Sequence, residues 1–158
     1  MNALSAYVPV DLYTGSRSRF LDNIRVHAGV DYYTDMNKVF HLSRINLNIT
    51  LPSIESGLPQ RIFDIMGIGG FCLTNAQPEV GELFEIGKEI EVFHNVDECV
   101  EKTLYYLSHE QERQQIAIRG YQRICADYTY DKRVAQMLAI ADADTNADPE
   151  TSQKEYTQ

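Results

Sequence analysis

The sequence lacks the features that mark several large classes of protein. No apolar run approaches the ~20 residues of a membrane-spanning helix, and the N-terminal stretch has neither the basic start nor the apolar core of a signal peptide. Basic residues are outnumbered, with 14 Lys and Arg against 23 Asp and Glu and a net charge of -9. Because nucleic acids and anionic membranes are bound through clustered Lys and Arg, we expect neither as a partner.

Cysteine is scarce as well. Cys72, Cys99 and Cys125 are odd in number and widely spaced, and no CxxC motif occurs. This pattern predicts reduced thiols in a cytoplasmic protein rather than a disulfide framework. Cys72 falls in an apolar strand and Cys99 on a predicted helix, so we expect both side chains to be buried and unreactive.

Widespread phosphate-binding and catalytic motifs are also absent. The sequence has no GxxxxGK[ST] loop, no GxGxxG after its first strand, no HExxH and no GxSxG nucleophile elbow. Its histidines do not have the spacing of metal ligands. A phosphate-bearing small molecule is not excluded, because one or two local donors suffice to bind it.

Strand-like and helix-like segments alternate along most of the chain. Short apolar or alternating stretches predict strands, and apolar residues three and four apart predict helices. Asn95, with Glu98 three residues later, is a good helix N-cap. We expect strands over residues 7–14, 24–30, 45–50, 71–74 and 90–93, and helices over 36–42, from 59, from 95, over 110–127 and from about 129. This alternation indicates an α/β domain with a doubly wound parallel sheet.

The C-terminal end has a different composition. From Asp142 onward the sequence is polar and acidic, contains Pro149 and shows no apolar periodicity. We therefore expect one folded domain over residues 1–141, ending in helices, and a disordered acidic tail over residues 142–158.

The stretch from 43 to 74 organises the rest of the chain. It predicts a strand, a Gly-containing loop, a helix that begins near Pro59, a Gly-rich turn and a second strand. A strand, crossover helix and strand form a right-handed parallel unit, and open parallel sheets bind ligands beyond the carboxyl ends of their strands. This arrangement places four residues at the rim of a cleft, with a helix N-terminus behind them: Thr50, Glu55, Ser56 and Gly57.

Arg61 and Asp64 are three residues apart on this helix and can share one face. The structural interpretation is an exposed ion pair worth only ~0.3 kcal/mol. The functional interpretation assigns a phosphate to Arg61, which lies in the first turn beside free backbone N–H groups. Asp64, one turn further, would accept hydrogen bonds from two vicinal hydroxyls, as on a ribose.

Two further features admit two interpretations each. Gly57 either supplies a left-handed turn or lets the backbone approach a ligand closely. Tyr32 and Tyr33, in the loop after the second strand, either stack on a nucleobase or pack as half-buried tyrosines.

Several short motifs recur in a recognisable order. They are LNIT at 47–50, SIESGLP at 53–59, Arg61, FDIMG at 63–67 and GGF at 69–71, with weaker matches VDYY at 30–33, ELF at 82–84, YYL at 105–107, GY at 120–121 and TY at 129–130. Together they resemble the C-terminal domain of bacterial GT-B glycosyltransferases, in the group similar to the CgeB spore-maturation protein. The resemblance covers roughly residues 7 to 138.

The resemblance implies a Rossmann-like half of a GT-B fold that binds a nucleotide-sugar donor. It implies that Asp64 binds the ribose and that Arg61 stabilises the diphosphate. Glu55 is the nearest candidate for the carboxylate beside the transferred sugar, although Asp64 follows it by nine positions rather than the commoner eight. Ser56 and Gly57 would line the sugar site. No metal and no cofactor other than the donor are expected, because a helix N-terminus and basic side chains typically stabilise the diphosphate in such enzymes.

Length sets a limit on this expectation. A complete GT-B enzyme needs two such domains, on the order of 300 residues, so we expect a missing N-terminal half or a partner chain that holds the acceptor. The alternative is a non-catalytic nucleotide- or protein-binding module derived from a glycosyltransferase. A flavodoxin-like or response-regulator-like domain is a weaker alternative, because Asp11 and Asp31 lack the companion Lys of a phosphorylation site.

Overall fold

The computed structural model describes residues 1–15, 22–51, 54 and 56–146 of the chain. The chain divides into two compact units, Met1–Ile124 and Cys125–Gln158, and the candidate sites below lie within the first. The first unit is an α/β fold whose strands are all paired in parallel, as the sequence predicts for a Rossmann-like half domain.

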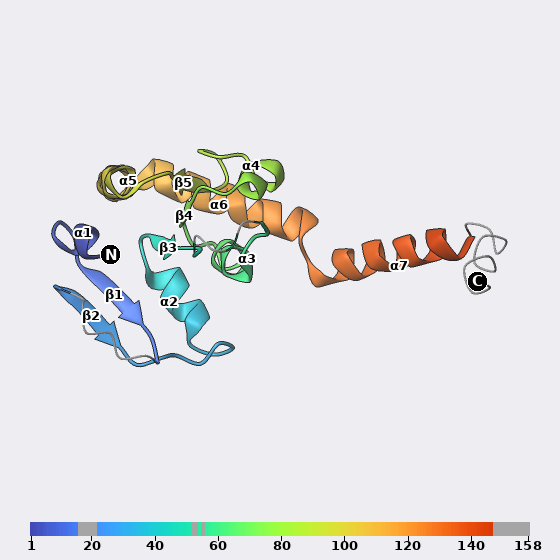
Figure 1. Ribbon diagram of the computed structural model, residues 1–158, viewed down its shortest axis with the longest axis horizontal. Helices are drawn as coiled ribbons and strands as arrows, with labels where there is room; N and C mark the ends of the chain where they lie inside the picture. Colours follow the sequence, from blue (N-terminus) through green and yellow to red (C-terminus); the bar gives the residue numbers. More distant parts are fainter. Residues whose placement is uncertain (16–21, 52–53, 55, 147–158) are drawn as a thin grey trace, which may run out of the picture. The chain divides into compact units, whose positions relative to one another are not determined.

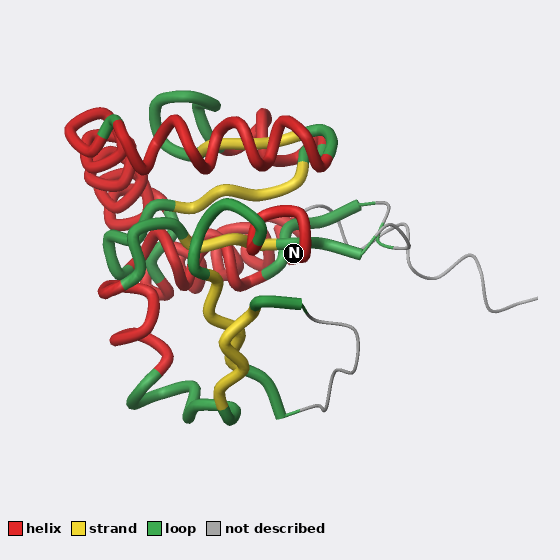
Figure 2. Tube along the Cα trace, turned by 90° about the vertical axis from the view of Figure 1, so that its left-hand side faces the viewer, coloured by secondary structure: helices red, strands yellow, loops and turns green. Residues whose placement is uncertain are grey.

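The strands form two small sheets, which Figures 1 and 2 show as separate groups. The first sheet pairs β1 (Val10–Tyr13) with β2 (Ile24–His27), and the second has the order β3-β4-β5, with β3 (Asn46–Asn48), β4 (Cys72–Asn75) and β5 (Glu91–Phe93). The single sheet expected from the sequence is thus divided within the described residues. The two sheets also differ in burial, because β5 is entirely buried whereas three of the four residues of β2 are exposed.

Seven helices are present in the described part of the chain. They are α1 (Asn2–Ser5), α2 (Met36–Leu42), α3 (Gln60–Gly67), α4 (Pro78–Leu83), α5 (Val96–Ser108), α6 (Glu110–Asp127) and α7 (Tyr130–Asn146). α2 and α6 have the predicted bounds, and Asn95 caps α5 by accepting the Glu98 N–H at 2.9 Å. α4 lies in a stretch that we expected to be an irregular connection. The expected start of the tail, Asp142, lies inside α7, and residues 147–158 lie outside the described residues, so the tail stays a prediction.

The core of the first unit is built from aromatic and aliphatic side chains of strands and helices. One cluster includes Leu4, Phe71, Leu73 and Tyr106, and the rings of Phe71 and Tyr106 are 4.8 Å apart. Burial also raises the pKa of the Cys72 thiol to about 12, and Cys99 is buried too, which confirms the predicted packing of both. None of the described helices combines the length and apolar character needed to span a membrane.

Gly120 lets α6 pack closely on its neighbours within the first unit. A Cβ at this position would lie 2.4 Å from the Glu89 carbonyl oxygen and 3.1 Å from the Met66 methyl group. Only a glycine therefore allows this approach, which holds α6 against α3 and the turn before β5.

Candidate functional site

The carboxyl ends of β3 and β4 are held together by polar side chains. Asn48 Nδ2 donates to Thr74 Oγ1 at 2.9 Å, and the backbone N–H of Thr50 donates to Asn75 Oδ1 at 2.7 Å. Asn48, Thr50 and Thr74 are all buried. Thr50 therefore lies at the predicted edge, where its backbone fixes the point at which the next loop leaves the sheet.

Asp64 lies one turn into α3 and faces the loop that follows β2. The Tyr32 hydroxyl donates to Asp64 Oδ1 at 2.8 Å, and Gln60 Nε2 donates to the same hydroxyl at 3.1 Å. Asp64 is half-buried, and Tyr32 is 37% exposed. Two residues that the sequence proposed from separate stretches are thus in direct contact. The neighbouring Tyr33 is 83% exposed and meets the Tyr32 ring edge-on.

Arg61 points toward α2 and the Tyr32 loop. Its guanidinium carbon lies 5.5 Å from the centre of the Phe40 ring and 5.9 Å from that of Tyr32, and the group donates to the Met36 sulfur. Cation–π contacts of this kind are worth ~0.5–1 kcal/mol at exposed sites. Among the described residues Arg61 and Asp64 do not form an ion pair, so the aromatic rings, rather than Asp64, position the guanidinium.

The loop before α3 is tied to the start of α4. Gly57 has φ +91°, the left-handed conformation that favours glycine, and a Cβ there would meet nothing within 4 Å. Its N–H donates to Glu79 Oε1 at 2.8 Å, and this hydrogen bond lowers the pKa of the Glu79 carboxyl. Ser56 is exposed. Glu55 lies outside the described residues, so its role stays a prediction.

A cavity of about 440 Å³ opens at the carboxyl ends of β4 and β5. Its walls combine apolar side chains such as Pro78, Ile86 and Val92 with the polar residues Gln77 and His94. This is the edge at which open parallel sheets bind ligands. Asp64, the Gly57 turn and the cavity all follow carboxyl ends of strands of the β3-β4-β5 sheet, and Tyr32 contacts Asp64 from the loop after β2 of the other sheet. These residues form the candidate site.

Comparison with known proteins decides the family. A family model described as glycosyl transferase-like matches residues 5–139. The chain belongs to this glycosyl transferase-like family. It is also 26% identical over 117 residues to the spore protein CgeB of Bacillus subtilis (strain 168), in an alignment that covers 74% of this chain and 35% of CgeB. The chain therefore spans about a third of the length of this curated relative.

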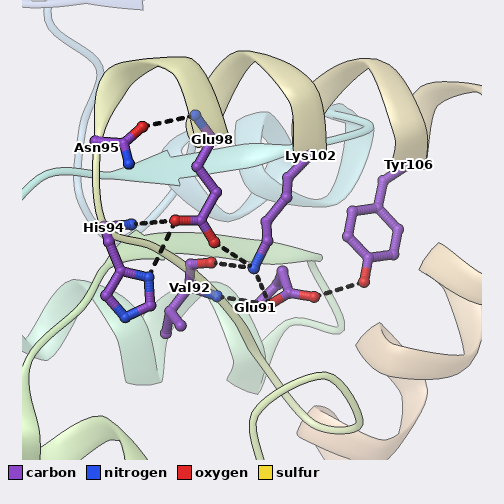
Figure 3. Close-up of polar contacts among 7 residues, drawn as sticks. All are labelled: Glu91, Val92, His94, Asn95, Glu98, Lys102 and Tyr106. Carbon is purple, nitrogen blue, oxygen red and sulfur yellow. Dashed lines mark hydrogen bonds and ion pairs between the residues drawn. The ribbon is translucent and has the colours of Figure 1, made fainter.

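A second polar cluster in this glycosyl transferase-like domain joins α5 to β5 (Figure 3). Lys102 Nζ lies 3.0 Å from Glu91 Oε1 and 3.0 Å from Glu98 Oε1, and it donates to the Val92 carbonyl at 2.6 Å. The Tyr106 hydroxyl donates to Glu91 Oε2 at 2.5 Å. Glu91 is only 5% exposed, and all three Lys102 donors have acceptors. The Lys102 donors and the Tyr106 hydroxyl are therefore all used within the protein, and the contacts of this cluster stabilise the packing of α5 on β5.

The pKa values of this cluster follow from its contacts. The His94 backbone N–H, followed by the side chains of Lys102 and His94, lowers the pKa of Glu98 to about 2. Burial opposes the charge on Lys102, but hydrogen bonds to Glu98 and Glu91 raise its pKa. Burial and the Glu91 contact raise the pKa of Tyr106. The Glu98 carboxylate and the Lys102 ammonium group are therefore both held in their charged forms.

The sequence pointed to Glu98 only as a capping residue, and it did not point to Glu91, Lys102 or Glu79. Glu91 is the one charged residue in an apolar strand, and Lys102 lies eleven positions later on a helix, so the spacing alone carried a weak signal. Glu79 had the ordinary signal of an acidic residue in the first turn of a helix. In the portion of the chain that the structure describes, no three His, Cys, Asp or Glu side chains are grouped so that they could hold a metal ion.

Proposed function

We propose that this glycosyl transferase-like chain is a donor-binding domain. It binds a nucleoside diphosphate sugar at the carboxyl edge of the β3-β4-β5 sheet for transfer of the sugar to an acceptor. The observation that carries the proposal is the contact between the Tyr32 hydroxyl and Asp64 Oδ1 at 2.8 Å. It places a half-buried carboxylate, already accepting from a hydroxyl, beside an aromatic ring at this edge.

Asp64 has the chemistry required to bind a ribose. A carboxylate has two oxygens and about four acceptor positions, so it can accept from both vicinal hydroxyls of the sugar. In the structure the Tyr32 hydroxyl takes one of these positions. A bound ribose presents the same kind of donor and would share or take over this contact, and the Tyr32 ring, which is 37% exposed, would lie beside the base.

Arg61 is the proposed partner of the diphosphate. A thioether sulfur is a weak acceptor, so the contact with Met36 leaves the guanidinium available for a phosphate. The group lies in the first turn of α3, near the free N–H groups and the positive end of the helix dipole. Arg61 and the N-terminus of α3 would together stabilise the departing diphosphate, which would lower the barrier to cleavage of the sugar–phosphate bond.

The loop before α3 is the proposed sugar site. Gly57 has open space where a side chain would otherwise project, and Ser56 is exposed beside it. Glu55 would be the carboxylate beside the transferred sugar. The acceptor would be bound by the part of the enzyme that corresponds to the rest of the longer relative, so this chain alone should bind the donor but transfer its sugar slowly.

Calorimetric titration of the full chain with UDP, GDP and ADP, first without metal and then with Mg²⁺, tests the proposal. We expect one diphosphate to bind without metal and Asp64→Ala to weaken its binding at least tenfold, about 1.4 kcal/mol. Glu101→Ala is the matched control, because Glu101 is an exposed carboxylate in the middle of α5. Equal binding by the wild type and the folded Asp64→Ala variant would contradict the assignment and favour the non-catalytic module.

A further inference from the structure

We propose a second binding site, at the opposite edge of the same sheet, for a small organic oxyanion. A pocket of about 290 Å³ lies where β3 and β4 begin. It is lined by residues that precede these strands and by one face of α6, among them Arg44, Phe71, Arg113 and Ala117. The ligand class is a carboxylate or phosphate head on a short apolar body. The donor-binding proposal does not use this pocket.

The charge of the pocket is the first argument. Arg113 is 9% exposed, and its Nη1 donates to the Arg44 carbonyl oxygen at 2.7 Å. Both guanidinium groups have the same carboxylate as their acidic neighbour: Glu110 lies 3.5 Å from Arg113 Nη2 and 3.9 Å from Arg44 Nη2. One carboxylate thus serves two arginines at distances longer than a charge-assisted hydrogen bond.

Glu110 is also poorly placed to neutralise the charges of Arg44 and Arg113. It is more than half exposed, and it accepts a hydrogen bond from Gln114 at 3.0 Å. Water and this amide therefore compete for its charge. Two arginines, Arg44 and Arg113, stand against one carboxylate, Glu110. The pocket therefore has a net charge of one positive unit, although the chain as a whole is strongly acidic.

The electrostatics of Arg113 agree with this geometry. Burial lowers the pKa of Arg113 despite the nearby Glu110, and the charge of Arg44 lowers it further. A guanidinium stays charged even so. An anion between the two arginines would offset both the burial and the repulsion, whereas a cation or a neutral ligand would offset neither.

The walls of the pocket indicate the rest of the ligand. Phe71 is buried at the base, and Leu42 and Ile118 are 80% and 55% exposed at the rim. These side chains can cover a short apolar body while the two arginine forks bind its oxyanion. The volume lies just below the ~300–1,000 Å³ typical of ligand pockets, so the ligand should be small.

Titration of the full chain at low salt tests the site with three probes: phenyl phosphate, hexanoate and inorganic phosphate. We expect phenyl phosphate or hexanoate to bind more tightly than inorganic phosphate, because only these probes bury apolar surface. Arg44→Gln should weaken that binding at least tenfold. Arg119→Gln is the matched control, an exposed arginine of α6 that does not line the pocket, and should leave the binding unchanged.

Glu110→Gln provides a test of opposite sign. Removal of the shared carboxylate should strengthen binding of the same probe several-fold, an effect that damage to the fold would not produce. Failure of all three probes to bind at millimolar concentration, or equal weakening by Arg44→Gln and Arg119→Gln, would overturn the proposal. Loss of binding in Arg61→Gln rather than Arg44→Gln would mean that the probe binds at the proposed donor site. That result would also overturn the second site, but it would leave the proposed function unaffected.

Discussion

Asp64 and Glu91 are both carboxylates near the β3-β4-β5 sheet, but their surroundings differ. Glu91 is 5% exposed and has contacts with Lys102 and Tyr106, whose donors are themselves fully used. Asp64 is half-buried and is held by the hydroxyl of an exposed tyrosine. The comparison separates a carboxylate whose partners are buried from one whose partner is accessible to water, as the proposed nucleotide site requires.

The largest expected effect comes from making the same truncation at both positions. Glu91→Ala leaves the buried Tyr106 hydroxyl without its acceptor and Lys102 without one of its two carboxylates, so the free energy of unfolding should fall by about 3 kcal/mol or more. Asp64→Ala should lower it by less than about 1 kcal/mol, because its partner is accessible to water. Urea unfolding of both variants measures the difference.

Two controls make this comparison sharper. Glu101→Ala, an exposed carboxylate on α5, should change stability by less than about 0.5 kcal/mol. Glu91→Gln keeps the size of the side chain and should lose less stability than Glu91→Ala. If Asp64→Ala and Glu91→Ala were equally destabilising, Asp64 would have to be regarded as a structural residue.

The sequence predicts the parts of the fold that depend on local periodicity. The bounds of α2 and α6 and the Asn95 cap follow from apolar spacing and from capping chemistry within a few residues. The helix α4 was missed because its short segment begins with Pro78 and contains Gly81, and in a sequence both residues indicate a turn as readily as a helix. The division into two sheets was missed because strand pairing depends on which apolar faces can be buried together, and a single strand does not encode that.

The candidate site was predictable in its members but not in its contacts. Asp64 and Tyr32 were each proposed from their own stretch, yet their hydrogen bond joins residues 32 positions apart. The partners of Glu91 were hidden for the same reason, since Tyr106 lies 15 positions away on a helix. Arg61 was expected beside Asp64, whereas the rings of Phe40 and Tyr32, from two other segments, position it.

Lowering the pH should have a smaller effect on the stability of the protein. The pKa of Glu98 is about 2 in the folded protein against an ordinary value of 4.5, so the folded state favours its charged form. Its contribution to stability is complete above about pH 4.5 and is lost as the pH falls toward 2. The urea midpoint of the wild type should therefore fall over this range by more than that of Glu98→Gln. Identical pH profiles would show that the contacts of Glu98 with His94 and Lys102 do not persist in solution.

The smallest effect tests whether the contact at Asp64 is replaceable. Tyr32→Phe removes the hydroxyl that holds Asp64 Oδ1 but keeps the ring beside Arg61. A nucleotide would then no longer have to displace that hydroxyl. Because a hydrogen bond of this kind contributes at least ~0.5 kcal/mol, nucleotide affinity should rise at least about twofold rather than fall.

Tyr32→Ala, which also removes the ring, should weaken binding by comparison with Tyr32→Phe, and the pair of variants separates the two roles of the side chain. Calorimetry with the diphosphate that binds the wild type gives both affinities. A drop in affinity in Tyr32→Phe as large as in Tyr32→Ala would mean that the hydroxyl itself contacts the nucleotide. Tyr32 and Asp64 would then act together as a preformed ribose site, and the distinction between a carboxylate with buried partners and one with an accessible partner would no longer explain how this edge of the sheet binds its ligand.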